Sequence, residues 1–398
     1  MKFFRILLLF FLILTLSACN GNTLPATPTA SKSKTIITYN DITYYFKDTT
    51  IYCSSSLSGN NQEYAVCSDS LCAHNLDSCP LFLGMRPYLM AIDPLESTEN
   101  DDYPIIYVSS MYFSTSDTKN PLRYRIIRYD SKNNKSKVIA SEIPNPINCF
   151  ITYGDHIFYT TNDGDAGYNI YRTDKNSSQI FSLDNSSNTS YTLIDVTSDH
   201  VYYNDLSGNI YRSPLSLDST EFVVSSASLY GSSYIFDDYL YYADNCIVTD
   251  VMGDTDVYSC SIFRKNLSDL TKSSDLYLNN ILYNGMPYFF IYENYAYYCI
   301  GNYNYIGKGF NYDLDNKKIE LDVYSDGSNK IYQSNLTLSS EPIVIDLGNE
   351  CLGTFYHGEG NNIIISTYES EFDLSKEYVF STKNISYNFT NNSFSPIP

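Results

Sequence analysis

Asp-His-Val-Tyr-Tyr at residues 199–203, followed by Asn-Ile-Tyr-Arg at 209–212, is one copy of a phrase that recurs along the chain. Closely similar pieces stand at 155–159 and 169–172, so these two copies start 44 residues apart. Further copies begin at Asp238, Asn294, Asp41, Pro104 and Asn362, and the last three of these are more divergent. Repeats of this kind are the first guide to the architecture of a chain.

The phrase alternates apolar and polar side chains, which is typical of strands, and Ser207-Gly208 provides a hairpin turn between its two halves. A period of about 45 residues with several short strands matches the four-stranded blade of a propeller. The sequence therefore predicts an all-β chain forming a β-propeller of six to eight blades, of which seven fits best. The alternative is two stacked β-sandwich domains.

The composition agrees with a strand-rich, acidic domain. The 398 residues include 41 Tyr, 21 Phe and no Trp, and Tyr favours pleated, half-buried surfaces. The formal net charge of -20 repels phosphate backbones, so we expect no nucleic acid partner.

The N-terminus carries export signals. Lys2 and Arg5 precede an uncharged apolar run, and Leu16-Ser17-Ala18-Cys19 follows it, which indicates a signal peptide over residues 1–18. The run is short for a membrane-spanning helix, the alternative interpretation. Residues 19–34 are small and polar and predict a flexible tether, which leaves residues 35–398 for the propeller.

Two resemblances follow from these residues. The segment ending at Cys19 resembles the lipobox of bacterial lipoproteins, which implies cleavage before Cys19, acyl chains such as palmitate on it, and a protein anchored at the outer face of the cell membrane. The repeated Ile-Tyr-Arg phrase resembles Tyr-rich propellers of Gram-positive surface lipoproteins and, more remotely, the Tyr-Trp-Thr-Asp propellers of receptor ectodomains. Those bacterial families mostly lack an assigned activity, so the resemblance implies a fold and not a reaction.

The cysteines suggest one local site. An insertion at about residues 53–80 has the spacing C-x₄-C-x-H-x₄-C, formed by Cys67, Cys72, His74 and Cys79. Three thiolates and an imidazole suit a structural zinc ion, whereas an exported domain also permits disulfides of these cysteines with one another or with Cys53. The insertion is similar to Cys/His insertions of Tyr-rich Gram-positive lipoproteins, which favours a structural role.

Six other cysteines follow Cys19 in the chain. Cys246 and Cys260 flank a predicted hairpin and are a candidate disulfide. The remaining four, for which three pairings are open, are Cys53, Cys149, Cys299 and Cys351.

Catalytic signals are weak. His156 and His200 occupy equivalent positions of the repeat, which favours a turn position over a catalytic one, and His357 lies outside the repeat. No nucleophile elbow, phosphate-binding loop, dinucleotide fingerprint or zinc-protease motif is present in the sequence. The favoured hypothesis is a binding or scaffold module for glycan or protein, because Tyr offers a flat apolar body with a polar tip. The alternative is a propeller-type glycan hydrolase or lyase.

Overall fold

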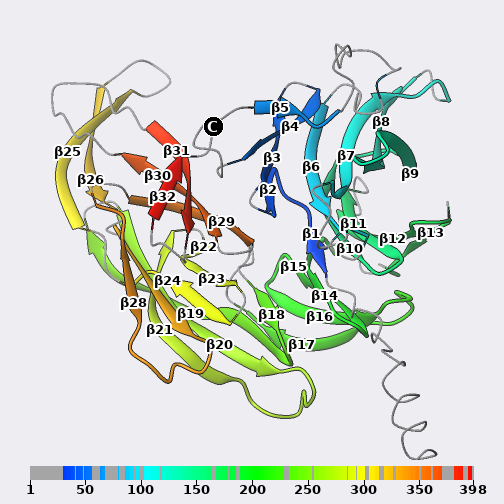
Figure 1. Ribbon diagram of the computed structural model, residues 1–398. Helices are drawn as coiled ribbons and strands as arrows, with labels where there is room; N and C mark the ends of the chain where they lie inside the picture. Colours follow the sequence, from blue (N-terminus) through cyan, green and yellow to red (C-terminus); the bar gives the residue numbers. More distant parts are fainter. Residues whose placement is uncertain are drawn as a thin grey trace, which may run out of the picture.

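The chain folds into a ring of antiparallel sheets (Figure 1). The computed structural model describes residues 30–396 apart from 41, 48, 56–62, 68–78, 80–85, 94–95, 98–102, 117–118, 163–166, 178, 185–188, 227–232, 253–254, 285, 293, 301–303, 313–317, 326–328, 349–350, 360–361, 370–380 and 389–392. In these described residues the regular structure consists of strands, with no helix, and seven sheets contain four or five strands each.

We number these sheets as blades in chain order. Blade 1 contains β2 (Ile36–Tyr39), β3 (Ile42–Lys47), β4 (Thr50–Ser55) and β5 (Glu63–Ala65). Blade 2 contains β6 (Arg86–Ile92), β7 (Ile105–Phe113), β8 (Leu122–Asp130) and β9 (Lys135–Ile143). Blade 3 contains β10 (Ile147–Tyr153), β11 (His156–Asn162), β12 (Tyr168–Asp174) and β13 (Ile180–Ser182), joined by β1 (Ser31–Lys32).

The later blades follow the same order. Blade 4 contains β14 (Tyr191–Val196), β15 (His200–Asp205), β16 (Asn209–Pro214) and β17 (Glu221–Ser225). Blade 5 contains β18 (Tyr234–Phe236), β19 (Tyr239–Met252), β20 (Thr255–Asn266), β21 (Asp275–Asn284) and β22 (Met286–Pro287). Blade 6 contains β23 (Phe289–Tyr292), β24 (Tyr295–Tyr298), β27 (Lys330–Asn335) and β28 (Ile343–Asp346). Blade 7 contains β29 (Cys351–Glu359), β30 (Asn362–Glu369), β31 (Ser381–Asn388) and β32 (Ser393–Pro396).

The ring closes on itself. The first strand of each blade contacts the first strand of the next, from β2 and β6 round to β23 and β29, and β29 contacts β2 in turn. The first and last blades consequently lie side by side (Figure 1). The prediction of a β-propeller with six to eight blades is confirmed, and stacked sandwiches are excluded.

A stacked aromatic pair recurs inside the blades and explains the Tyr-rich phrase. Tyr203 at the middle of β15 lies directly opposite Tyr211 of β16, with ring centroids 5.9 Å apart. Four further blades have the same pair at the same register, and the centroid distances are 6.5 Å for Tyr45 and Tyr52, 5.4 Å for Tyr159 and Tyr171, 6.0 Å for Tyr242 and Phe263, and 5.8 Å for Tyr298 and Tyr332. Facing aromatic side chains of this kind stabilise a strand pair beyond simple burial.

The arginine of the phrase connects neighbouring blades. Arg172 of blade 3 donates from Nη1 to the carbonyl oxygen of Leu215 in blade 4, at 2.8 Å. Arg212 of blade 4 donates in the same way to the carbonyl oxygen of Leu267 in blade 5, at 3.0 Å. The repeated residue therefore serves a repeated contact between blades.

An additional hairpin interrupts blade 6. Strands β25 (Asn304–Tyr312) and β26 (Lys318–Ser325) pair with each other and lie between β24 and β27 in the chain. This hairpin accounts for the long interval between the copies that begin at Asn294 and Asn362. It projects from the ring in Figure 1.

Ring closure differs from the simplest expectation for a propeller. The strand-like run Thr35–Tyr39 is expected to pair with terminal strands near 378–380 and 385–389, and this expectation is wrong for the described residues. Strand β2 instead pairs with β3 through a hairpin at Asn40, which has a φ of 49°, and β31 pairs with β30 and β32. A local hairpin closes a short loop and so costs less chain entropy than pairing across the whole domain. Residues 378–380 lie outside the described residues.

The segment before β2 runs along the inner strands of two other blades. Strand β1 pairs with β10, and the amide of Phe150 donates to Ser33 Oγ at 2.8 Å. Lys34 and Met90 exchange two backbone hydrogen bonds of 2.7 Å, which attach the same segment to β6. Residues 31–34 therefore tie the start of blade 1 to blades 2 and 3.

We predict that a truncation starting at Thr35 lowers the melting temperature by several degrees relative to one starting at Ala30. The truncation removes the contacts of Ser33 and Lys34 with Phe150 and Met90, each hydrogen bond contributing about 1 kcal/mol. Calorimetric unfolding of both proteins checks this. Equal melting temperatures would show that this segment does not support the ring.

Candidate functional site

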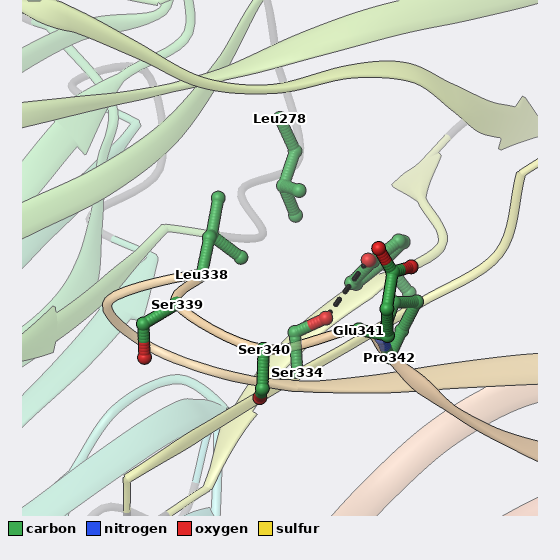
Figure 2. Close-up of a pocket in the computed structure, with 8 residues that line it drawn as sticks. Leu278, Ser334, Leu338, Ser339, Ser340, Glu341 and Pro342 are labelled. Atoms are coloured by element: carbon green, nitrogen blue, oxygen red, sulfur yellow. Dashed lines mark hydrogen bonds between the residues drawn. The ribbon is translucent and has the colours of Figure 1, made fainter.

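A pocket of about 470 Å³ opens between blades 5 and 6 (Figure 2). One side is Leu278 of β21, and the other is the loop that joins β27 to β28. The lining residues are Leu278, Tyr298, Ser334, Leu338, Ser339, Ser340, Glu341 and Pro342. The pocket is open to solvent, and Leu278, Leu338 and Pro342 supply an apolar part beside a larger polar surface.

The polar groups of the pocket come from two levels. Tyr298 and Ser334 are buried, and their hydroxyl groups share a hydrogen bond of 3.0 Å, drawn as the dashed line in Figure 2. Ser339, Ser340 and Glu341 belong to the loop above them. The pocket thus combines hydroxyl groups, which both donate and accept, with one carboxylate.

Asn335 holds the loop in one conformation. Its Nδ2 donates to the hydroxyl oxygens of Ser339 and Ser340 at 3.0 and 3.2 Å. Its Oδ1 accepts from the amide of Ser339 and the hydroxyl of Thr337, both at 3.0 Å. An Asn that bonds to its own following turn fixes the backbone locally, so the pocket wall is preformed.

The structure brings two of the four predicted zinc residues together. Cys67 and Cys79 are both buried, and their Sγ atoms lie 3.8 Å apart within the apolar cluster between blades 1 and 2. Cys53 packs against the same cluster. Cys72 and His74 lie outside the described residues, as does Cys19.

The second cysteine pair is also brought together. Cys246 of β19 and Cys260 of β20 share a side-chain hydrogen bond beside an irregularity of the strand pair. This contact and burial raise the pKa of the Cys260 thiol. The remaining cysteines lie in or next to four different blades, because Cys53 belongs to β4, Cys149 to β10 and Cys351 to β29, and Cys299 follows β24.

The histidines have the positions that the repeat indicates. His156 and His200 begin β11 and β15, and His156 Nδ1 lies 2.7 Å from Asp174 Oδ1. Burial, followed by the charge of Arg212, lowers the pKa of His200. His357 lies in β29 opposite Ile364 rather than in a loop.

A buried ionic network joins blades 2 and 3, and sequence reasoning missed it. Lys175 Nζ contacts the carboxylates of Asp93 and Glu96, the latter at 2.9 Å, and the side chains of Lys175 and Asp93 are only 6% and 3% exposed. Glu96 also accepts from Tyr107 Oη at 2.6 Å and Arg128 Nε at 2.8 Å. Charges removed from water in this way are tolerated only when they are paired.

The network affects titration. Burial alone would raise the pKa of Glu96, but hydrogen bonds from Tyr107, Lys175 and Arg128 outweigh it and hold the pKa below its usual value. The stability that Glu96 contributes is therefore present above its unfolded-state pKa and is lost as the pH falls through the lowered, folded-state pKa.

One signal in the sequence points to this network. Lys175 follows the third strand of its blade at the position where Leu215, Leu267 and Leu336 stand in other copies. A lysine in place of a buried or half-buried leucine needs a carboxylate partner. The partner, Asp93, lies 82 positions away in the chain, so spacing alone does not reveal it.

Comparisons with known proteins agree with the fold. No protein-family model matches the chain, and the search of curated proteins returned no match. Among solved structures, a post-proline cleaving enzyme from Rickettsia typhi is similar with a TM-score of 0.51 and 10% identity, over 94% of this chain and 53% of that chain. The β-propeller domain of the Trilobed protease from Pyrococcus furiosus has a TM-score of 0.45 and 9% identity, over 92% of this chain and 98% of that domain.

The tricorn protease also matches, with a TM-score of 0.45 and 10% identity over 92% of this chain, which spans 39% of that protease. This chain thus covers about half or less of the length of the tricorn protease and the Rickettsia enzyme. At such identities the likeness concerns the fold alone.

Within the residues that the structure describes, no helix is long and apolar enough to cross a membrane.

We predict that Lys175→Leu lowers the free energy of unfolding by about 3 kcal/mol, because it leaves the Asp93 carboxylate buried without its partner. The double variant Asp93→Asn, Lys175→Leu should recover most of this loss. Urea unfolding of the single and double variants measures the coupling.

The surface pair Lys272 and Asp269, 3.5 Å apart, supplies the control. Lys272→Leu should change the free energy of unfolding by less than about 1 kcal/mol. An equally small effect of Lys175→Leu would contradict the assignment of a buried, coupled network.

Proposed function

We propose that this protein is a lipid-anchored, extracytoplasmic β-propeller that acts as a binding module for a glycan or protein. The observation that carries the binding role is the preformed pocket between blades 5 and 6, which combines three apolar side chains with hydroxyl groups and one carboxylate. The Leu-Ser-Ala-Cys sequence ending at Cys19 supports the anchor. A propeller offers a rigid ring on which loops present such a site.

Binding and turnover are separated by one experiment on the purified domain. The protein is incubated with labelled cell-wall and dietary polysaccharides, and both retained and released label are measured. A binding module retains the polysaccharide unchanged, whereas the alternative, a glycan hydrolase or lyase, releases shorter products. Release of products that depends on the domain would contradict the binding role.

The proposed lipid anchor predicts that membrane attachment depends on one cysteine. Replacing Cys19 by Ala should remove label derived from a fatty-acid precursor and release the protein from the membrane fraction, because stable attachment needs the acyl chains. Cys53→Ala is the matched control and should keep both the label and the membrane location. A Cys19→Ala protein that stays in the membrane with an uncleaved N-terminus would favour a spanning helix instead.

We further propose that Cys67 and Cys79 are two ligands of a structural zinc ion, with Cys72 and His74 as the other two. Zn–S bonds of about 2.3 Å at tetrahedral angles place two sulfurs about 3.8 Å apart. The Sγ atoms of Cys67 and Cys79 are separated by this distance. Their burial between blades 1 and 2 suits a site that stabilises the fold.

The zinc proposal predicts about one equivalent of zinc in protein purified without chelator, and its loss in Cys67→Ser. Cys53→Ser, next to the same cluster, should keep the metal. Mass spectrometry of unreduced protein distinguishes the alternative. Ligand thiols become alkylatable after metal removal, whereas a linked pair among Cys67, Cys72 and Cys79 would show that they form a disulfide.

A further inference from the structure

Blade 4 contains a loop equivalent to the one that lines the pocket in blade 6, so the two blades can be compared directly. After the third strand, the amide of Leu217 donates to the carbonyl of Pro214, and the amide of Leu338 donates to that of Asn335, both at 2.9 Å. Both leucines have a positive φ, 63° and 52°. The turns of blades 4 and 6 are therefore equivalent, and differences beyond them are specific to one blade.

We call the space between this turn and the neighbouring blade the slot. Between blades 3 and 4 the slot is filled by two leucines. Leu217 of blade 4 and Leu183 of blade 3 are each 2% exposed and belong to one buried cluster. Leu338, the equivalent of Leu217, is 37% exposed. Leu278 of blade 5 is the counterpart of Leu183, because it lies beside Ile262 as Leu183 lies beside the equivalent Ile170. Leu278 is nevertheless only half-buried. The slot that is closed between blades 3 and 4 is open between blades 5 and 6.

The polar floor of the slot also differs. In blade 4 the hydroxyl of Tyr203 has two partners, Ser213 at 2.9 Å and Thr220 at 2.8 Å. In blade 6 the equivalent Tyr298 bonds to Ser334, the counterpart of Ser213, at 3.0 Å.

The residue that closes the floor in blade 4 has no direct counterpart in blade 6. The turn leucine and the residue opposite the phrase's fourth position are Leu217 and Glu221 in blade 4, but Leu338 and Ile343 in blade 6, so the connection in blade 6 is one residue longer. Glu341 and Pro342 consequently stand where blade 4 has Thr220. A capping hydroxyl is replaced by a carboxylate and a rigid ring at the wall of the open slot.

We propose that this slot binds one or two neutral sugar residues of a glycan, with Glu341, Ser334 and Ser340 as the polar contacts and Leu278 and Leu338 as the apolar wall. This inference rests on the proposed binding function and gives it a site and a ligand class. A carboxylate accepts hydrogen bonds from two vicinal hydroxyls of a sugar, and serine hydroxyls both donate and accept. The C–H groups of a pyranose are apolar and bury against the side chains of Leu278 and Leu338.

Charge selects among ligands. The glutamate in the wall and the net charge of -20 disfavour anionic groups. A wholly apolar ligand would offer no partner to the second hydroxyl donor of the Tyr298–Ser334 pair, because the bond between these two hydroxyls uses only one of their two donors. A neutral polyol satisfies both conditions, and a pocket of about 470 Å³ accommodates it.

The test measures binding of a panel of neutral methyl glycosides and disaccharides to the full mature domain by saturation-transfer NMR and calorimetry. We expect the tightest glycoside to bind with a Kd that changes little in about 0.5 M NaCl, because no ion pair is involved. Glu341→Thr restores the residue type of blade 4. It should raise this Kd about tenfold or more and leave the melting temperature unchanged or higher.

A matched pair of variants separates binding from folding. Ser334→Ala and Ser213→Ala each remove a hydroxyl partner of an equivalent tyrosine, so both should lower stability by a similar small amount. Only Ser334→Ala should weaken glycoside binding, several-fold, because Ser213 lies in the closed slot.

Three results would overturn the proposal in distinguishable ways. Glycoside binding that is equal in the native protein, Glu341→Thr and Ser334→Ala would place the sugar site elsewhere, while the broader glycan-binding function would stand. Salt-sensitive binding of n-butylamine without glycoside binding would show that Glu341 recognises an ammonium group, such as that of a lysine in a protein ligand. Retention of polysaccharide without any glycoside binding would refute the small sugar site.

Discussion

Five blades of this propeller depend on the same interaction, an aromatic pair between the second and third strands. Tyr203 against Tyr211, and the equivalent pairs in four other blades, lie in register across antiparallel strands. Each pair is worth about 0.5–1.5 kcal/mol beyond the burial of its area. Because the tyrosine hydroxyls reach the edge of the core, each buried ring also needs a polar partner there, such as Ser213 in blade 4. The residues at that edge must therefore provide a hydrogen-bond partner for the tyrosine, which connects the packing of the core to the sequence of the loops.

This connection between core and loops explains why the buried ion pair and the pocket both lie between blades. The residue after the third strand and the turn that follows it fill the slot toward a neighbouring blade, so a substitution there changes an interface rather than a surface. Leu215 and Leu217 provide apolar contacts in blade 4. Lys175 replaces the equivalent of Leu215 and forms a buried ion pair with Asp93, whereas Leu338, the equivalent of Leu217, lines a pocket together with Glu341. One repeated scaffold thus supports three local chemistries.

The repeat in the sequence was sufficient for the fold and insufficient for the site. Strands β11, β12, β15 and β16 coincide with the predicted pieces, and Gly208 has the positive φ of 83° that the turn at Ser207-Gly208 requires. These features depend on neighbours in the chain. The pocket depends on whether Leu278 and Leu338 are covered by side chains of another blade, which periodicity does not report. Its detectable signal is the extra residue and the carboxylate at Glu341, visible only once blades 4 and 6 are aligned by their hydrogen bonds.

The ring closure was wrongly predicted for a related physical reason. A strand shared between the first and last blades would secure the ring by hydrogen bonds, but in the described residues β2 and β29 each pair within their own blade and contact each other as edges of two complete sheets. Blade 1 must then be held from its other side. The backbone bonds of Lys34 to Met90 and of Ser33 to Phe150 provide one connection, and the buried Cys67 and Cys79 lie in the cluster that joins blades 1 and 2. A crosslink at these thiols, through metal or disulfide, would therefore reinforce the contact between blades 1 and 2.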